Sequence, residues 1–146
     1  DGSYLLQNSD IYSSVLYDKK LIIVVCDNGG HMVINRLQLA KGGKEYLCNL
    51  REARASNLQF VDFEAHAKSM GANAETVKSI SDLEAAFKRA KKSEKTYVIS
   101  IQNHGYEWLE GSAFWESPTL EIYSSEGNKK AYKEFEEGKS KQRKGV

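Results

Sequence analysis

The sequence predicts an α/β protein with a mostly parallel central sheet flanked by helices. One observation is an uninterrupted apolar run at residues 21–26, because strands that are buried on both faces of a parallel sheet lack polar alternation. The other is the order of patterns further along the chain, where two helical segments alternate with two short strand candidates. Strands and helices that alternate in this way form right-handed crossovers, which bring the strands together in parallel.

The first thirty residues predict a short helix, a buried strand and a turn. Residues 8–17 carry apolar side chains at spacings that indicate a short helix, with Asn8 or Ser9 as its cap. The apolar strand follows, and Cys26 at its end is expected to be a small core residue. Residues 27–30, Asp-Asn-Gly-Gly, are typical of a turn.

The elements after residue 60 have clearer boundaries. A helix is expected from Asp62, its cap, to Ser69, and Gly71 stands where the chain needs a left-handed residue to leave that helix. The next helix carries apolar side chains at spacings of three, four and seven, which gives it one buried face. The expected elements around it are a strand at 75–78, a capping box at Ser81–Glu84 that opens the helix, and a strand at 96–101.

The remaining segments are less regular. Residues 32–39 have an ambiguous pattern that is compatible with a helix, whereas residues 40–56 are polar and predict a long loop, which is often functional. Residues 102–118 are aromatic and loop-like, and these aromatic side chains are expected to pack against the core or another subunit. Residues 128–137 predict a terminal helix, and residues 139–146 predict a solvated charged tail.

Composition describes an ordinary globular protein of one domain. The 146 residues are 40% hydrophobic and 28% charged. A net charge of +1 gives no long-range attraction to nucleic acid or a membrane surface, and the longest apolar run is too short to span a bilayer. We see no secretory signal, and Cys26 and Cys48 have no metal-binding or disulfide spacing, so a cytoplasmic protein is expected.

Two turn-like sequences supply the residue types of a site for a divalent metal and a diphosphate. Asp1-Gly2-Ser3 and residues 27–30 are each, taken alone, usually turns. Together they place the Asp1 carboxylate and the Asn28 amide 27 positions apart (28 − 1), and both groups are hard oxygen ligands that suit Mg²⁺. The glycines allow the backbone to approach phosphate oxygens closely. Ligands of open α/β sheets bind beyond the carboxyl ends of the strands, and Asn28 follows such a strand.

These residues and the elements after them resemble the diphosphate-binding domain of thiamine diphosphate-dependent enzymes. The motif of that family is Gly-Asp-Gly followed, across a buried strand, by Asn-Asn at a spacing that includes this one. Here Asp27 stands in place of the first Asn, and the leading Gly would precede residue 1. The resemblance implies a thiamine-diphosphate-binding, Rossmann-like fold over residues 1–146, truncated at its N-terminal strand, with a C-terminal extension from about residue 102.

The resemblance also implies roles for particular residues. Thiamine diphosphate and Mg²⁺ would be the cofactors, and two diphosphate oxygens and a water would complete an octahedron around the metal. No catalytic residue is assigned in this chain, because the glutamate that activates the cofactor belongs to another domain in this family. The implied residues are Asp1, Asn28 and the Gly30 carbonyl for Mg²⁺, Gly2 and Ser3 for the diphosphate, and His31, Met32 and Val33 for the middle of the cofactor.

Within that superfamily the chain resembles the trihydroxycyclohexane-dione hydrolases of inositol catabolism. This likeness is carried by residues 34–38 after the Asp27-Asn28 pair, by residues 104–107 and by residues 114–118. It implies an enzyme that opens a cyclic diketone, a small molecule, by hydrolytic C–C cleavage. It also implies an upstream pyrimidine-binding domain of the same enzyme as a partner, and a homodimer or tetramer.

Two other functions stay open on the sequence. One is an acetolactate-synthase-like decarboxylase and carboligase, which would use the same cofactors on a different substrate. The other is a cofactor-binding or assembly domain without catalysis. His104 is expected to be structural, with contact to a polyol substrate as the alternative.

Overall fold

A parallel three-stranded sheet forms the centre of the part of the chain that the structure describes. The structure is a computed structural model, and it describes residues 1–52, 60–107, 122 and 125–142. The strands lie in the order β1-β3-β2, and both neighbouring pairs are parallel. The predicted α/β fold with a parallel sheet is therefore confirmed. The strands are β1 (Ile22–Asp27), β2 (Asn73–Val77) and β3 (Tyr97–Gln102).

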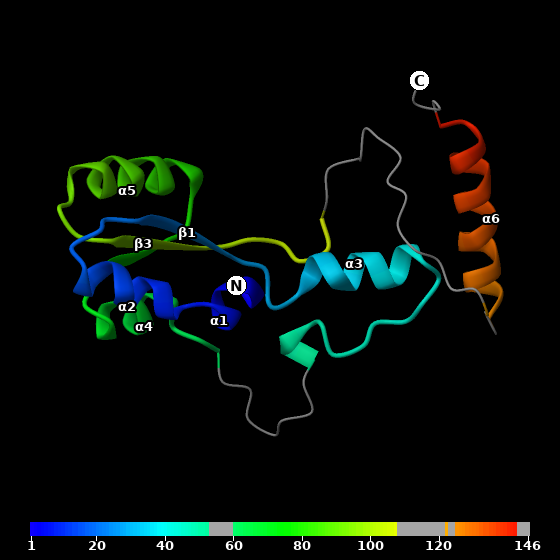
Figure 1. Cartoon of the computed structure of the whole chain (residues 1–146), viewed down its shortest axis with the longest axis horizontal. Coiled ribbons are helices and arrows are strands. Elements are labelled where there is room, and N and C mark those ends of the chain that lie inside the picture. The colour runs from blue at the N-terminus through cyan, green and yellow to red at the C-terminus, as the bar shows by residue number, and fades with distance from the viewer. Residues whose placement is uncertain (53–59, 108–121, 123–124, 143–146) are drawn as a thin grey trace.

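Helices lie on both faces of this sheet (Figure 1). Helix α5 covers one face, whereas α2 and α4 lie on the other. Helix α3 extends away from the carboxyl ends of the strands, and α6 lies beyond its far end. The helices are α1 (Gly2–Leu6), α2 (Ser9–Leu16), α3 (Met32–Ala40), the 3₁₀ turn η1 (Leu50–Glu52), α4 (Phe63–Ser69), α5 (Ile80–Lys92) and α6 (Glu126–Ser140).

Among the residues that the structure describes, the core consists of two apolar clusters, one on each face of the sheet. Val98 and Ile99 are adjacent in β3, so their side chains point to opposite faces and each joins a different cluster. The cluster around Val98 includes Ile11 from α2 and Phe63 from α4, whereas the cluster around Ile99 includes Ala86 from α5. β3 is therefore the strand that both helical layers bury.

Strand β1 departs from its expected two-sided burial. Only Val25 is buried in this strand, and Val24 and Cys26 are exposed. These two alternate residues share the face of Ile22, which packs against the α5 cluster. Helix α5 packs over β2 and β3, so it covers only the beginning of that face of β1. The expectation of a core Cys26 was therefore wrong.

The helix ends match the predicted chemistry at α4 and differ at α5. Asp62 caps α4, because its carboxylate accepts a hydrogen bond of 2.9 Å from the backbone N–H of Ala65. Gly71 has a φ of +87°, in the left-handed region, as predicted. The cap of α5 is Ser79 rather than Ser81: its hydroxyl accepts from the Asp82 N–H at 3.1 Å and donates to the Asp82 carboxylate at 2.7 Å.

Other expectations hold with shifted boundaries. The ambiguous segment at 32–39 forms α3, and the terminal helix runs from Glu126 to Ser140, so the first residues of the expected tail belong to it. Asn8 occupies the cap position of α2, but its side chain makes no capping hydrogen bond. Most of the expected aromatic loop, including Trp108, and the stretch 114–118 lie outside the described residues.

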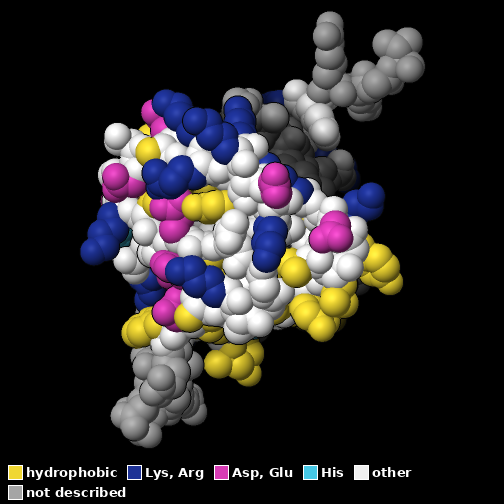
Figure 2. Space-filling view, turned by 90° about the vertical axis from the view of Figure 1, so that its left-hand side faces the viewer, with side chains coloured by type: hydrophobic (Ala, Val, Ile, Leu, Met, Phe, Trp, Pro, Cys, Tyr) yellow, Lys and Arg dark blue, Asp and Glu magenta, His cyan; other side chains and the backbone are white. Residues whose placement is uncertain are grey.

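The surface carries charges of both signs. In the view of Figure 2, basic and acidic side chains are interspersed, and hydrophobic side chains gather along one side. Within the described residues, no helix combines the length and apolarity needed to cross a membrane.

Candidate functional site

Asp1, Asn28 and Gly30 meet at the carboxyl edge of the sheet. The backbone nitrogen of Asp1 donates a hydrogen bond of 3.1 Å to the carbonyl of Cys26, which places Asp1 beside the end of β1. The backbone N–H of Asn28 lies 3.4 Å from Oδ1 of Asp1. The structure thus brings together the three residues for which the family resemblance implies metal ligation.

The Asn28 amide is the centre of this arrangement. One of its two terminal atoms lies 2.9 Å from Oδ1 of Asp1 and 3.1 Å from the carbonyl oxygen of Gly30. With the amide nitrogen in that position, the side chain donates to both oxygens. A half-turn of the amide exchanges its nitrogen and oxygen, and three oxygens then converge.

The spacing of these atoms suits a small divalent cation. Adjacent ligands of an Mg²⁺ octahedron, with bonds of about 2.0–2.1 Å, lie about 2.8–3.0 Å apart. The two distances from the Asn28 amide position are 2.9 and 3.1 Å. A carboxylate, an amide and a backbone carbonyl are also the oxygen donors that such a cation prefers. Among the described residues there is no group of three His, Cys, Asp or Glu side chains that could hold a metal, so this mixed set is the candidate.

The Gly29–Gly30 turn is held by the loop that follows α3. The His31 N–H donates to the carbonyl of Cys48 at 2.8 Å, and the Leu50 N–H donates to the carbonyl of Gly29 at 2.9 Å. Gly30 has a φ of +148°, and a side chain there would collide with the Cys48 carbonyl. The loop therefore fixes the direction of the Gly30 carbonyl from outside the motif.

The other predicted cofactor residues occupy different environments. Gly2 is buried against the ring of His31: an added Cβ would lie 2.5 Å from His31 Nδ1 and 3.0 Å from the Gly30 oxygen. Ser3 is exposed, and His31 is half-buried at the start of α3. Met32 is 2% exposed whereas Val33 is 57% exposed, so α3 turns these two side chains in different directions.

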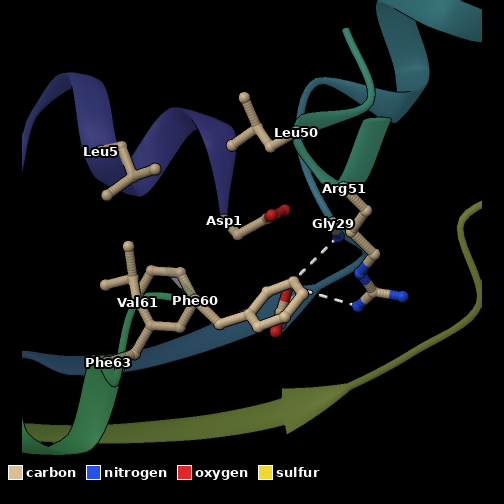
Figure 3. A pocket seen from close by; sticks show the side chains of 9 residues that line it. Asp1, Leu5, Gly29, Leu50, Arg51, Phe60, Val61 and Phe63 are labelled. Atoms are coloured by element: carbon tan, nitrogen blue, oxygen red, sulfur yellow. Dashed lines mark hydrogen bonds and ion pairs between the residues drawn. The ribbon is translucent and has the colours of Figure 1, made fainter. Parts of the chain in front are cut away.

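Three cavities lie at this edge of the sheet, and Arg51 lines all of them. A narrow pocket is lined by Asp1, Asp27 and Arg51 together with apolar side chains (Figure 3). In that view Asp1 projects toward the loop that carries Leu50 and Arg51. A cleft of about 540 Å³ continues from it along the ends of β2 and β3.

A second cleft, of about 490 Å³, lies on the Asn28 side of the sheet edge. Polar side chains line most of this cleft. The hydroxyl of Tyr106 connects the segment after β3 to the loop after α3, because it accepts a hydrogen bond from the Asn49 amide at 2.9 Å and donates one to the Glu45 carboxylate at 3.1 Å. The lining residues of the cleft are Asn28, Met32, Asn49, Arg51, Gln102, Asn103, His104, Gly105 and Tyr106.

Sequence reasoning did not predict Arg51 and Asn49 at this edge. Both belong to the long polar loop, where no periodic pattern distinguishes one side chain from its neighbours. They reach the site because the loop pairs with the glycine turn through an antiparallel bridge between Gly30 and Asn49. The Gly29–Gly30 pair was the feature of the sequence that could have indicated this contact, because glycines allow another backbone segment to approach closely.

Comparison with known proteins identifies the class. Residues 1–101 match the family described as thiamine pyrophosphate enzyme, C-terminal TPP binding domain. The match covers more than half of the chain, so the chain belongs to this family of thiamine diphosphate-binding domains.

Relatives of this chain include enzymes named 3D-(3,5/4)-trihydroxycyclohexane-1,2-dione hydrolase. The protein of that name from Halalkalibacterium halodurans is 33% identical over an alignment of 138 positions that covers 90% of this chain and 21% of the relative. The one from Listeria monocytogenes is 33% identical over 92% of this chain and 21% of its own length. The one from Bacillus subtilis is 29% identical over 90% of this chain and again 21% of its own length. The chain thus spans about a fifth of the relatives that it matches.

Proposed function

We propose that this chain holds Mg²⁺ and the diphosphate of thiamine diphosphate at the carboxyl edge of its sheet. The approach of the Asn28 amide to Oδ1 of Asp1, at 2.9 Å, and to the Gly30 carbonyl oxygen, at 3.1 Å, is the observation that carries this proposal. Gly2 and Ser3 would offer backbone N–H groups to the diphosphate, and His31, Met32 and Val33 would border the middle of the cofactor.

The bound cofactor would supply a nucleophilic carbon and an electron sink for breaking a C–C bond next to a carbonyl. The described residues of this chain would contribute binding and orientation. Asp1 would partly neutralise the metal, the Asn28 amide would turn its oxygen toward it, and the loop at Cys48 and Leu50 would keep the Gly30 carbonyl in place.

We propose further that the whole enzyme hydrolyses a cyclic 1,2-diketone that carries hydroxyl groups. The names of the relatives support this class of substrate. The polar cleft beside Asn28 supports it as well, since amide and phenol groups such as those of Asn49, Asn103 and Tyr106 can exchange hydrogen bonds with a polyol ring. His104, which is exposed at the rim of this cleft, would then face the substrate.

The larger assembly is part of the proposal. Because the chain spans 21% of the length of its relatives, we infer that an upstream pyrimidine-binding domain completes the active site. We also propose a homodimer or tetramer. Sedimentation of the complete protein would give the mass of at least two subunits, whereas a monomer that turns over substrate would contradict this arrangement.

Turnover by the complete protein separates the candidate functions. With Mg²⁺ and thiamine diphosphate present, the cyclic trihydroxy-dione should be opened to an acyclic acid, and pyruvate should not be consumed. Consumption of pyruvate with no action on the dione would favour the acetolactate-synthase-like alternative. Tight cofactor binding without turnover of either substrate would favour a non-catalytic domain.

A further inference from the structure

Two carboxylates line the narrow pocket beside the edge of the sheet where we propose that the diphosphate binds. Asp1 and Asp27 both line it, and only Asp1 belongs to the proposed metal ligands. Oδ1 of Asp27 accepts a hydrogen bond of 3.1 Å from the Gly29 N–H, which keeps this carboxylate at the sheet edge. An uncompensated carboxylate there would repel a second anion, since charges interact strongly where water is partly excluded.

Arg51 is placed to offset that charge. Its Nη2 lies 4.0 Å from Oδ1 of Asp27, and both side chains are partly exposed. It borders the narrow pocket and both larger clefts, and among their described lining residues it is the one Lys or Arg side chain. The positive charge of Arg51 therefore raises the electrostatic potential in all three cavities.

The local backbone brings the guanidinium to this place. The Arg51 N–H donates to Oδ1 of Asn49 at 3.0 Å, which fixes the start of η1. The guanidinium end of the side chain then passes over Gly29, where an added Cβ would lie 2.7 Å from Nε of Arg51. Gly29 thus leaves the space through which Arg51 reaches Asp27 (Figure 3).

We propose that Arg51 neutralises Asp27 so that this edge of the sheet can accept an anionic diphosphate. The inference rests on the proposed function of the same site. A long, partly exposed ion pair of this kind contributes little to folding stability. We therefore expect its main effect to be on the electrostatic potential of the pocket. Arg51 is therefore a positioning and charge-compensating residue, and Asp27 is the group through which it acts.

A double-mutant cycle in the complete protein tests this pairing. The measurement is the dissociation constant of thiamine diphosphate at saturating Mg²⁺, by calorimetry, for the parent, Arg51→Gln, Asp27→Asn and the double variant. We expect Arg51→Gln to weaken binding about tenfold, and the double variant to recover most of that loss because no carboxylate is left to offset. Arg51→Lys should retain affinity near that of the parent, and thermal melting of each variant checks that it is folded.

The outcomes are distinguishable. A double variant that binds as weakly as Arg51→Gln would overturn charge compensation and point to direct contact between Arg51 and the ligand. The loss in Arg51→Gln should also shrink at high ionic strength, and an unchanged loss in 1 M salt would likewise count against the inference. Failure of the parent itself to bind thiamine diphosphate would refute the proposed function, a result that differs from either of these.

Discussion

Individual glycines decide whether the site can form. Gly2 lies so close to His31 that an added Cβ would be 2.5 Å from Nδ1 of its ring and 3.0 Å from the Gly30 oxygen. Any side chain at this position must displace the imidazole or the carbonyl that we propose as a metal ligand. The site is thus built on close backbone approach rather than on charged side chains alone.

Gly2→Ala should therefore weaken both the fold and the metal site. Overpacking of this kind destabilises by about 1–3 kcal/mol, and the affinity for Mg²⁺ should fall with it. Chemical denaturation and a metal titration measure the two effects. Gly138→Ala, within helix α6, is the control and should be neutral or stabilising, since alanine has the higher helix propensity. Unchanged stability and Mg²⁺ affinity in Gly2→Ala would contradict the close packing described for Gly2.

The stability of the core depends strongly on a single residue, Ile99. This side chain is fully buried in the central strand against α5. Ile99→Ala should lower the free energy of unfolding by about 2–5 kcal/mol, because it leaves a cavity that the sheet cannot close. Ile80→Ala, at a position that is 67% exposed, should change it by less than about 0.5 kcal/mol in the same denaturation experiment. Equal effects of the two substitutions would contradict the assignment of the core.

At the scale of elements, Glu75 couples β2, α5 and β3. Its carboxylate accepts from Arg89 Nη2 at 2.6 Å and Nε at 2.9 Å, and from the Tyr97 hydroxyl at 2.6 Å. The hydrogen bonds from Arg89, followed by that from Tyr97, hold the pKa of Glu75 below its usual value. The ionised form of Glu75 therefore stabilises the folded state.

This coupling predicts how stability depends on pH. A carboxylate whose pKa is lower in the folded state contributes stability above its unfolded pKa, and that contribution is lost as the pH falls through the folded pKa. Glu75→Gln should therefore be less stable than the parent at pH 7, and the difference should vanish in strong acid. Urea denaturation at a series of pH values measures it, with the exposed Glu84→Gln as control. A difference that grows toward low pH would contradict the role of the Glu75 carboxylate.

Elements with local signals were predicted well, and those set by distant contacts were not. Asp62 and Gly71 mark the ends of α4 by their own side-chain and backbone chemistry, so the sequence suffices. At α5, Ser79 and Ser81 offer the same spacing to an acidic residue, and the extended backbone at Ser79 decides between them. The exposure of Cys26 depends on where α5 packs, which no residue in β1 specifies.

The same division applies to the site. The proximity of Asp1, Asn28 and Gly30 could be predicted because their spacing across one strand resembles a known motif, and their role as metal ligands stays a prediction. Arg51 could not be predicted, because it reaches Asp27 only after the loop pairs with Gly30 through a long-range bridge. Residue type alone does not distinguish this arginine from the other basic residues of the chain.

At the scale of the whole molecule, the candidate site lies at the carboxyl ends of the strands of the sheet. The family match and the close approach of Asp1, Asn28 and Gly30 agree on cofactor binding, whereas the relatives are about five times as long as the part matched here. We therefore expect cofactor binding to be a property of the assembled enzyme. Within that assembly, the described residues would supply the metal ligands and much of the diphosphate contact.

The central claim is that Asn28 ligates a metal that this cofactor requires. Calorimetric titration of thiamine diphosphate into the complete protein, with and without Mg²⁺, tests it most directly. We predict binding that depends on Mg²⁺ and that weakens by about a hundredfold or more in Asn28→Ala, while Asn8→Ala binds as the parent does. Binding that is independent of the metal, or an Asn28→Ala protein with unchanged affinity, would contradict the account.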